Sequence, residues 1–234
     1  MTTAAQPADT PSRPPAWQRI LPQLIYLGLI IAAAFRYDTL GWPPFVWIAG
    51  SVALTLIRAP FAKANKANVI NEHRRGFIET VLLIIVFLFL AAFPNIQLAT
   101  GVLSFADYRL PEAAAWTGAA LQIPFIWLFW RSHADLGRNW SVSLELREDH
   151  GLVTNGVYKR IRHPMYSSIW LGALAQPLLV QNWIAGALAI PAFGLMYLIR
   201  VPREEAMMRA RFGDAYHDYM RQTGRVLPRL RQAN

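Results

Sequence analysis

The 234-residue chain contains no cysteine. This absence excludes disulfide bonds, thiolate zinc sites and cysteine nucleophiles together. The chain has only five histidines, and none of them lies within five residues of another. Because metal-binding histidines commonly occur as closely spaced pairs, the sequence shows no local metal site. We therefore expect no catalytic metal.

Glycine patterns that bind nucleotides are missing as well. No two of the fourteen glycines are separated by a single residue, so Gly-x-Gly does not occur. This excludes the dinucleotide fingerprint and the related glycine loops that cradle phosphates. The Gly-x-Ser-x-Gly nucleophile elbow is absent too. These absences argue against a Rossmann-type methyltransferase and against an ATP-driven pump.

Charged residues are scarce, at 16% of the chain, whereas 54% of the residues are hydrophobic. Soluble domains carry about a quarter charged residues, so this composition points to a protein embedded in lipid. The apolar residues gather in six runs, which are Ile20–Phe35, Trp42–Ile57, Phe77–Phe93, Ala113–Trp130, Met165–Val180 and Trp183–Ile199. Each is near the length of ~20 residues with which a helix crosses the hydrocarbon core. The sequence therefore predicts an all-α, polytopic membrane bundle with about six transmembrane helices.

The positions of the basic residues explain the net charge of +9. If the N-terminus is cytoplasmic and all six runs cross the membrane, 21 of the 23 Lys and Arg residues lie on the cytoplasmic side. Only Arg36 and Arg109 lie outside. This asymmetry follows the positive-inside rule and predicts cytoplasmic termini, as in the inner membrane of a prokaryote. We expect membrane lipids as partners and no nucleic acid.

Three regions are expected along the chain. Residues 1–16 contain four prolines among small polar residues and are typical of a disordered tail. Residues 17–130 form a four-helix transmembrane region. Residues 131–234 form a catalytic region with a transmembrane hairpin at 165–199 and a C-terminal amphipathic helix. The first apolar run also resembles a signal peptide, but its length and the long tail before it favour a retained span.

The last two apolar runs are joined only by Gln181 and Asn182. So short a connection predicts an antiparallel helical hairpin whose cytoplasmic ends lie side by side. The polar stretches that flank the hairpin, 132–166 and 200–230, are then brought into one site beneath the membrane. This is the main structural inference from the sequence.

The stretch before the hairpin contains a turn and a helix start. Asn155-Gly156 is a turn signal. Pro164 suits the first turn of the following helix, where a missing backbone donor costs nothing. Arg162 and His163 therefore sit at a helix entrance on the lipid–water boundary. They serve there either as a cationic membrane anchor or as ligand contacts.

The stretch after the hairpin is amphipathic. Its apolar residues recur at helical spacing, and they are Met208, Phe212, Tyr216 and Tyr219. The spacing predicts a helix lying along the membrane surface. Glu204 and Glu205 would occupy its first turn after Pro202, where they either face the helix dipole or bind a ligand. Another carboxylate, Glu79 in the third apolar run, is either functional or snorkels to the interface.

The motifs of the last hundred residues resemble one family when they are taken together. They are Leu136-Gly137-x-x-Trp140, Leu152-Val153-Thr154-x-Gly156-x-Tyr158, Arg162-His163-Pro164-x-Tyr166, Glu204-Glu205, Phe212-Gly213-x-x-Tyr216-x-x-Tyr219 and Arg225-x-x-Pro228. In this order, with a helical hairpin between them, they resemble the isoprenylcysteine carboxyl methyltransferases and their bacterial and archaeal relatives. That family shares a superfamily with phospholipid N-methyltransferases. The first four apolar runs match only in being apolar.

The resemblance implies a cytoplasmic, non-Rossmann pocket for S-adenosyl-L-methionine. The positions that it assigns to the cofactor are Leu152, Val153, Gly156, Tyr158, His163, Pro164, Tyr166, Glu204 and Glu205. The catalytic positions that it implies are Arg162, Glu205 and either Arg221 or Arg225, since the C-terminal register fits both arginines. One departure is Ser168, where the family often has glycine.

Methyl transfer is an in-line displacement, so positioning supplies much of the catalysis. A carboxylate acceptor is already ionised at neutral pH and requires an orienting cation rather than a base. The fork of an arginine suits this role. An amine acceptor would instead require Glu204 or Glu205 as a base.

We therefore expect S-adenosylmethionine-dependent methyl transfer to a lipophilic acceptor, with an isoprenoid or prenyl-cysteine-like carboxylate as the best candidate. The alternatives are a phospholipid amine N-methyltransferase, an NADPH-dependent sterol-type reductase and a structural or transport bundle. The last is disfavoured because transporters place their polar sites at mid-membrane. The sequence leaves the oligomeric state open.

Overall fold

A computed structural model of the protein describes residues 16–65, 76–137 and 151–229. In this part of the chain the secondary structure is helical, and β-pairing is limited to two isolated bridges. The elements are α1 (Ala16–Ala34), α2 (Tyr37–Leu40), α3 (Pro43–Asn65), α4 (Phe77–Phe87), η1 (Leu88–Ala92), α5 (Phe93–Thr100), η2 (Ser104–Ala106), α6 (Glu112–Leu136), η4 (Gly156–Lys159), α7 (Pro164–Leu179), η5 (Trp183–Ala187), α8 (Ala189–Phe212) and α9 (Asp214–Gln222).

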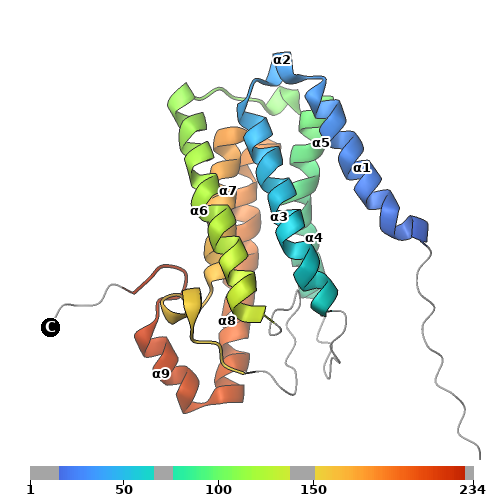
Figure 1. Ribbon diagram of the computed structural model, residues 1–234. Helices are drawn as coiled ribbons and strands as arrows, with labels where there is room; N and C mark the ends of the chain where they lie inside the picture. The colour runs from blue at the N-terminus through green and yellow to red at the C-terminus, as the bar shows by residue number, and fades with distance from the viewer. Residues whose placement is uncertain (1–15, 66–75, 138–150, 230–234) are drawn as a thin grey trace, which may run out of the picture.

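The long helices run up and down along one axis and form a bundle (Figure 1). Four helical stretches are long and apolar enough to cross a membrane, and they are Pro43–Ala62, Phe77–Thr100, Glu112–Leu136 and Trp183–Phe212. A shorter apolar helix covers Ile20–Ala34. The predicted all-α membrane bundle is thereby confirmed, and each of the six apolar runs overlaps a helix. That all six of them cross the membrane stays a prediction.

Small residues bring α6 and α7 close together. A Cβ added to Gly118 of α6 would lie 2.9 Å from side-chain atoms of Leu178 and Leu179. A Cβ added to Gly172 of α7 would lie 2.7 Å from the ring of Phe125. Small residues allow close helix packing in lipid, where no hydrophobic force drives helices together. The start of α7 is therefore held firmly beside the end of α6.

The hairpin has the short turn that the sequence predicts. Helix α7 ends at Leu179 and η5 begins at Trp183. The Asn182 side chain accepts hydrogen bonds from the backbone of Ile184 and Ala185 and so caps η5. Its amide also donates to Asp107 Oδ1 at 2.7 Å. The turn is thus fixed at the end of the bundle opposite to the candidate site.

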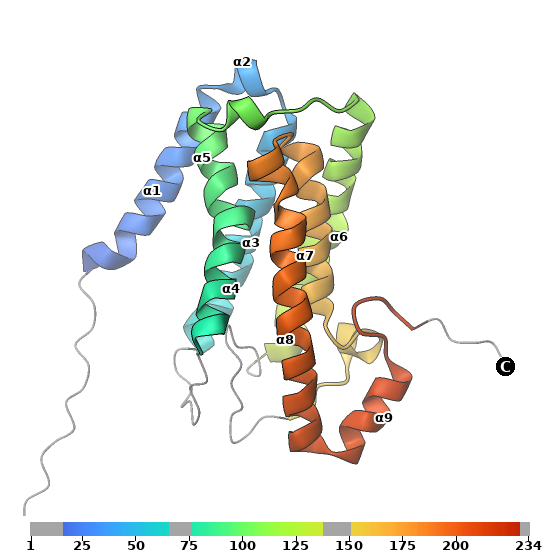
Figure 2. The same ribbon diagram turned by 180° about the vertical axis from the view of Figure 1, so that it is seen from behind.

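The C-terminal part differs from the predicted single amphipathic helix. Helix α8 does not begin at Pro202 but runs through it to Phe212, so Glu204 and Glu205 lie in its interior and not in a first turn. The chain then turns at Gly213, whose φ of +51° favours glycine. Helix α9 follows, and Figure 2 shows it angled away from the lower end of α8.

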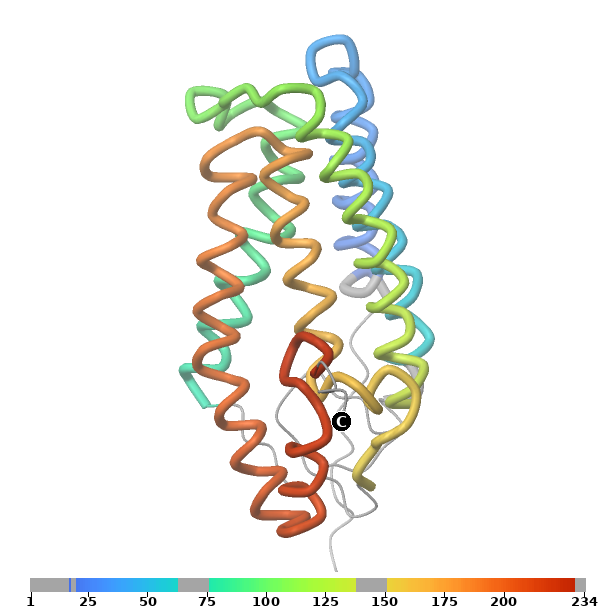
Figure 3. Tube along the Cα trace, turned by 90° about the vertical axis from the view of Figure 1, so that its left-hand side faces the viewer, coloured from blue at the N-terminus to red at the C-terminus, as the bar shows by residue number. Residues whose placement is uncertain are grey.

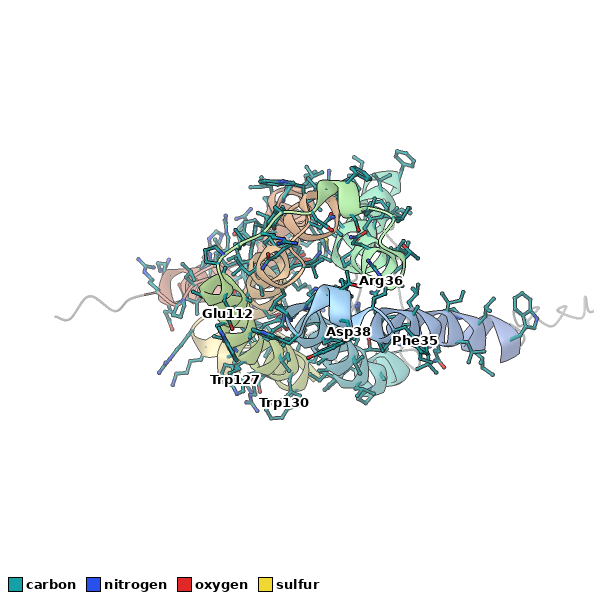
Figure 4. The ribbon with its side chains drawn as sticks, turned by 90° about the horizontal axis from the view of Figure 1, so that it is seen from above. Phe35, Arg36, Asp38, Glu112, Trp127 and Trp130 are labelled. Carbon is teal, nitrogen blue, oxygen red and sulfur yellow. The ribbon has the colours of Figure 1, made fainter. Side chains whose placement is uncertain are left out.

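Helix α1 lies at the edge of the bundle. Seen from above, it points outward from the other helices, with Phe35 and Arg36 near its inner end (Figure 4). The Arg36 guanidinium donates to the carbonyls of Gln97 and Leu98, which ties this end of α1 to α5. The predicted tail at 1–16 lies outside the described residues except for Ala16.

Candidate active site

The predicted site residues gather at the lower end of the bundle, around the start of α7. The segment before α7 pairs with the segment after α9, which Figure 3 shows side by side. The backbone amide of Arg162 donates to the carbonyl of Gly224 at 2.8 Å, and that of His163 donates to Arg225 at 2.9 Å. Residues that are 62 positions apart in the sequence are therefore joined by backbone hydrogen bonds.

Two arginines converge on Glu205, whose side chain is only 1% exposed. Arg162 Nε donates to Glu205 Oε1 at 3.2 Å. Arg225 donates from Nε to the same oxygen at 3.2 Å and from Nη2 to Oε2 at 2.7 Å. A two-pronged guanidinium–carboxylate contact is stronger and more directional than a single charged hydrogen bond. Glu205 therefore fastens the C-terminal segment to the entrance of α7.

Arg162 also holds the chain that follows α9. Its Nη1 donates to the carbonyl of Met220, in the last turn of α9, and to that of Thr223, just after the helix. Arginine suits this position because its guanidinium presents several donors in a fixed plane. The side chain is 8% exposed. Arg162 therefore holds the segments of the site together and is not a surface anchor.

His163 lies between the two glutamates. Its Nδ1 is 3.5 Å from Glu204 Oε2, and its Nε2 is 3.3 Å from Glu205 Oε1. Burial lowers the pKa of His163, but the two carboxylates outweigh this effect and leave the pKa raised above its ordinary value. The ring packs edge-on against Tyr166, with centroids 5.6 Å apart.

Glu204 is the more accessible of the two glutamates, with 20% of its side chain exposed. The Tyr166 hydroxyl donates to its Oε1 at 2.6 Å, and Arg200 Nε donates to the same oxygen at 2.9 Å. Arg200 in turn lies close to Glu79, with Nη2 3.7 Å from Oε1. The charged network therefore extends from the C-terminal segment to α4.

Tyr158 and Gly156 fix η4 beneath α6. The Tyr158 hydroxyl donates to the carbonyl of Ser132 at 3.2 Å, and the Tyr219 hydroxyl donates to the carbonyl of Tyr158 at 2.7 Å. Burial raises the pKa of both phenols, so both remain neutral donors. Gly156 has φ +54°, and a Cβ there would lie 2.1 Å from an oxygen of Asp135. These contacts hold η4 against the end of α6 and against α9.

The structure separates the two candidate C-terminal arginines. Arg225 reaches Glu205, as described above. Arg221 is 74% exposed and pairs with Asp218 on the surface of α9. Leu152 and Val153 lie half-buried just before η4, and Pro164 is buried at the first position of α7. Trp140 lies outside the described residues.

Sequence reasoning missed two side chains of this network. Arg200 lies four residues before Glu204, a spacing that pairs charges on a helix, but the expected helix start at Pro202 hid the pair. Ser167 donates to the carbonyl of Val226 and so also ties α7 to the C-terminal segment. Only the tertiary contact identifies Ser167, because a serine at a helix start has no distinctive pattern.

The fold and the site define a class: an all-α membrane bundle with charged groups from α7, α8 and the C-terminal segment gathered at one end. Residues 120–210, from the middle of α6 to near the end of α8, match the model of the isoprenylcysteine carboxyl methyltransferase family. The resemblance that the motifs indicated is thereby confirmed for this region.

Individual proteins are similar to this chain as well. The protein-S-isoprenylcysteine O-methyltransferase of Schizosaccharomyces pombe is 31% identical over 87 residues, which are 37% of each chain. That of Tribolium castaneum is 35% identical over 94 residues, 38% of this chain and 32% of the relative. The nickel-cobalt-cadmium resistance protein of Alcaligenes xylosoxydans xylosoxydans is 26% identical over 162 residues, 69% of this chain and 67% of the relative. The chain spans about a third of the length of the first two relatives.

Proposed function

We propose that the protein is an integral-membrane methyltransferase that uses S-adenosyl-L-methionine and esterifies the carboxylate of a lipophilic, isoprenoid or prenyl-cysteine-like acceptor. One observation carries the proposal: Arg162-His163 and Glu204-Glu205, which are some forty residues apart, meet at one end of the bundle. The family match over residues 120–210 and the similarity to protein-S-isoprenylcysteine O-methyltransferases support it.

The donor set fits the cofactor. S-adenosylmethionine supplies a methyl group on a sulfonium together with an ammonium, a carboxylate and ribose hydroxyls. Glu204, which is partly exposed, accepts hydrogen bonds from such an ammonium or hydroxyl. Tyr166 and His163 hold this carboxylate in place from both of its oxygens.

Glu205 has a different role from that of Glu204. Because it is 1% exposed and its oxygens already receive Arg162 and Arg225, it holds arginines rather than ligand. Arg225 is 47% exposed, so it is the arginine of this cluster most accessible to an acceptor. We assign to it the orientation of the acceptor carboxylate, which needs no general base.

Calorimetry on the detergent-purified protein tests the cofactor. S-adenosylmethionine and its demethylated product should bind, and NADPH should give no heat. Binding of NADPH alone would instead identify a sterol-type reductase. If none of the three binds, the protein is not an enzyme of either kind and the proposal fails.

Incubation with radiolabelled S-adenosylmethionine and a membrane lipid extract tests the acceptor. A methyl ester releases its label as volatile methanol in mild base, whereas an N-methylated phospholipid keeps it. Base-labile label supports carboxylate methylation. Base-stable label in the phospholipid fraction would show that the amine alternative is correct.

A further inference from the structure

Glu79 is a buried carboxylate on a helix outside the region that matches the family. It lies in the first turn of α4, at the same end of the bundle as the site, and is 5% exposed. An interfacial carboxylate commonly snorkels into water, but this one is turned into the bundle. A buried charge is retained only where it is paired, so a cation is expected beside the Glu79 carboxylate.

Glu79 pairs with Arg200 of α8, at 3.7 Å from Nη2 to Oε1. Arg200 is itself 8% exposed, and its Nε donates to Glu204 Oε1 at 2.9 Å. The guanidinium therefore stands between a carboxylate of α4 and a carboxylate of the candidate site. Through it, the first half of the chain contacts the group to which we assign the cofactor.

The surroundings restrict what Arg200 can do. The groove beside the pair is lined by Leu82 and Leu83 of α4 and by Met196, Ile199 and Arg203 of α8, so that most of its wall is apolar. Because charge interactions are stronger where water is scarce, the attraction between Glu79 and Arg200 is stronger here than at an open surface. A long arginine side chain has many rotamers, and an anchoring carboxylate reduces them. Glu79 thus fixes the direction from which Arg200 reaches Glu204.

We propose that Glu79 is a positioning residue: by holding Arg200 against Glu204, it sets the orientation of the carboxylate that binds the cofactor. This inference rests on the proposed function, because it needs Glu204 to contact S-adenosylmethionine. It adds that α4 takes part in building the cofactor site.

Calorimetric titration with S-adenosylmethionine tests the proposal on the full chain. Glu79→Gln should weaken binding about fivefold to tenfold, the range for residues coupled in one charged network. In methyl-transfer assays the KM for S-adenosylmethionine should rise by the same factor, and kcat should stay within twofold. Glu79→Asp, which keeps the charge, should restore part of the affinity. The matched control is Glu112→Gln at the other end of the bundle, with an expected affinity within twofold of wild type.

The double variant Glu79→Gln, Glu204→Gln distinguishes a relay from a general effect on folding. If Glu79 acts through Glu204, the double variant binds no more weakly than Glu204→Gln alone. Independent, multiplying effects would overturn the proposal, as would unchanged affinity and KM in Glu79→Gln. If Glu79→Gln does not fold, Arg200→Lys tests the same contact and carries the same expectation.

The outcomes separate the two proposals. If the wild-type protein does not bind S-adenosylmethionine, the proposed function fails, and the positioning role falls with it. If the wild-type protein binds and Glu204→Gln weakens binding, but Glu79→Gln does not, only the positioning role fails. If Glu204→Gln itself leaves binding unchanged, Glu204 is not a cofactor contact and Glu79 positions nothing.

Discussion

At the scale of single residues, the charges of the site converge on Glu205. Its carboxylate is almost fully buried and receives guanidinium groups from the entrance of α7 and from the segment after α9. A buried carboxylate that loses its partner retains its desolvation cost, so removing one partner is more harmful than the contact alone suggests. Replacing Arg225 or Arg162 is therefore expected to lower the stability of the protein as well as its activity.

Arg225→Ala and Arg221→Ala form a matched pair of arginine truncations. Arg225→Ala should lower kcat/KM for methyl transfer about 100-fold, because an acceptor carboxylate loses its cation. It should also destabilise the protein by about 1–2 kcal/mol, a value reduced for the partial exposure of Arg225. Arg221→Ala, on the surface of α9, should change stability by less than about 0.5 kcal/mol. Equal loss of activity in both variants would contradict the assignment to Arg225.

His163 makes stability depend on pH. Its pKa is raised in the folded protein, because the charges of Glu204 and Glu205 outweigh its burial. The stabilisation is therefore fully present below the unfolded pKa, about 6.5. It is lost as the pH rises through the higher folded pKa. In thermal unfolding from pH 6 to 9, the Tm of the wild type should exceed that of His163→Gln most at pH 6. The difference in Tm should become smaller as the pH rises. A difference in Tm that grows with pH would show that folding lowers the pKa of His163 instead of raising it.

At the scale of elements, one glutamine supports two irregular helical segments. The Nε2 of Gln176 on α7 donates to the carbonyl of Phe89 in η1 and to that of Ala185 in η5, at 2.7 Å each. Both segments are π-helical, a form in which backbone hydrogen bonding departs from the α-helical pattern. Since lipid offers no water, the side chain of a neighbouring helix satisfies these carbonyls.

Gln176→Leu should destabilise the protein by about 2 kcal/mol, because the buried carbonyl of Ala185 and the partly buried carbonyl of Phe89 lose this donor. The matched control is Gln122→Leu on α6. Gln122 is similarly buried, and within the described residues its Oε1 has no hydrogen-bond partner. Replacing this unpaired amide should be neutral or stabilising. Thermal unfolding of both variants in the same detergent provides the measurement. A larger loss in Gln122→Leu would contradict the role given to Gln176.

At the scale of the whole molecule, the bundle has two chemically different ends. At the end with η2 and the hairpin turn, the segments are joined by hydrogen bonds of side-chain amides such as those of Asn182 and Gln97. The other end carries η4, α9 and the charged network. Between them the outer surface is apolar: Trp127 and Trp130 stand at the outer edge of α6 in Figure 4, and both are about half exposed. Such a surface suits lipid and not water.

The absence of native cysteine allows a direct test of orientation. Single cysteines are introduced by Val102→Cys, before η2, and by Gln222→Cys, at the end of α9. Because the charged end is predicted to face the cytoplasm, a membrane-impermeant maleimide should label only Val102→Cys in intact cells. Gln222→Cys should react once the membrane is opened. The reverse pattern would invert the topology while leaving the bundle itself intact.

Local sequence patterns were sufficient for a large part of this protein. Apolar runs placed the helices, because a segment that spans lipid must satisfy its own backbone and be apolar over its whole length. The two-residue link between the last runs predicted the hairpin, and the hairpin predicted that Arg162-His163 and Glu204-Glu205 share one end. The motifs predicted the family region that the comparison confirms.

Tertiary structure alone decided which charges meet. Pro202 suggested a helix start, but α8 continues through it: Val201 and Glu205, four residues apart on one helix face, are buried, whereas Pro202 is exposed. The choice of Arg225 over Arg221 depends on where the chain turns after α9, and the Glu79–Arg200 contact depends on how α4 lies against α8. Local sequence patterns encode periodicity and turns within a few residues. The pairing of side chains from distant helices is set by packing, which no local pattern contains.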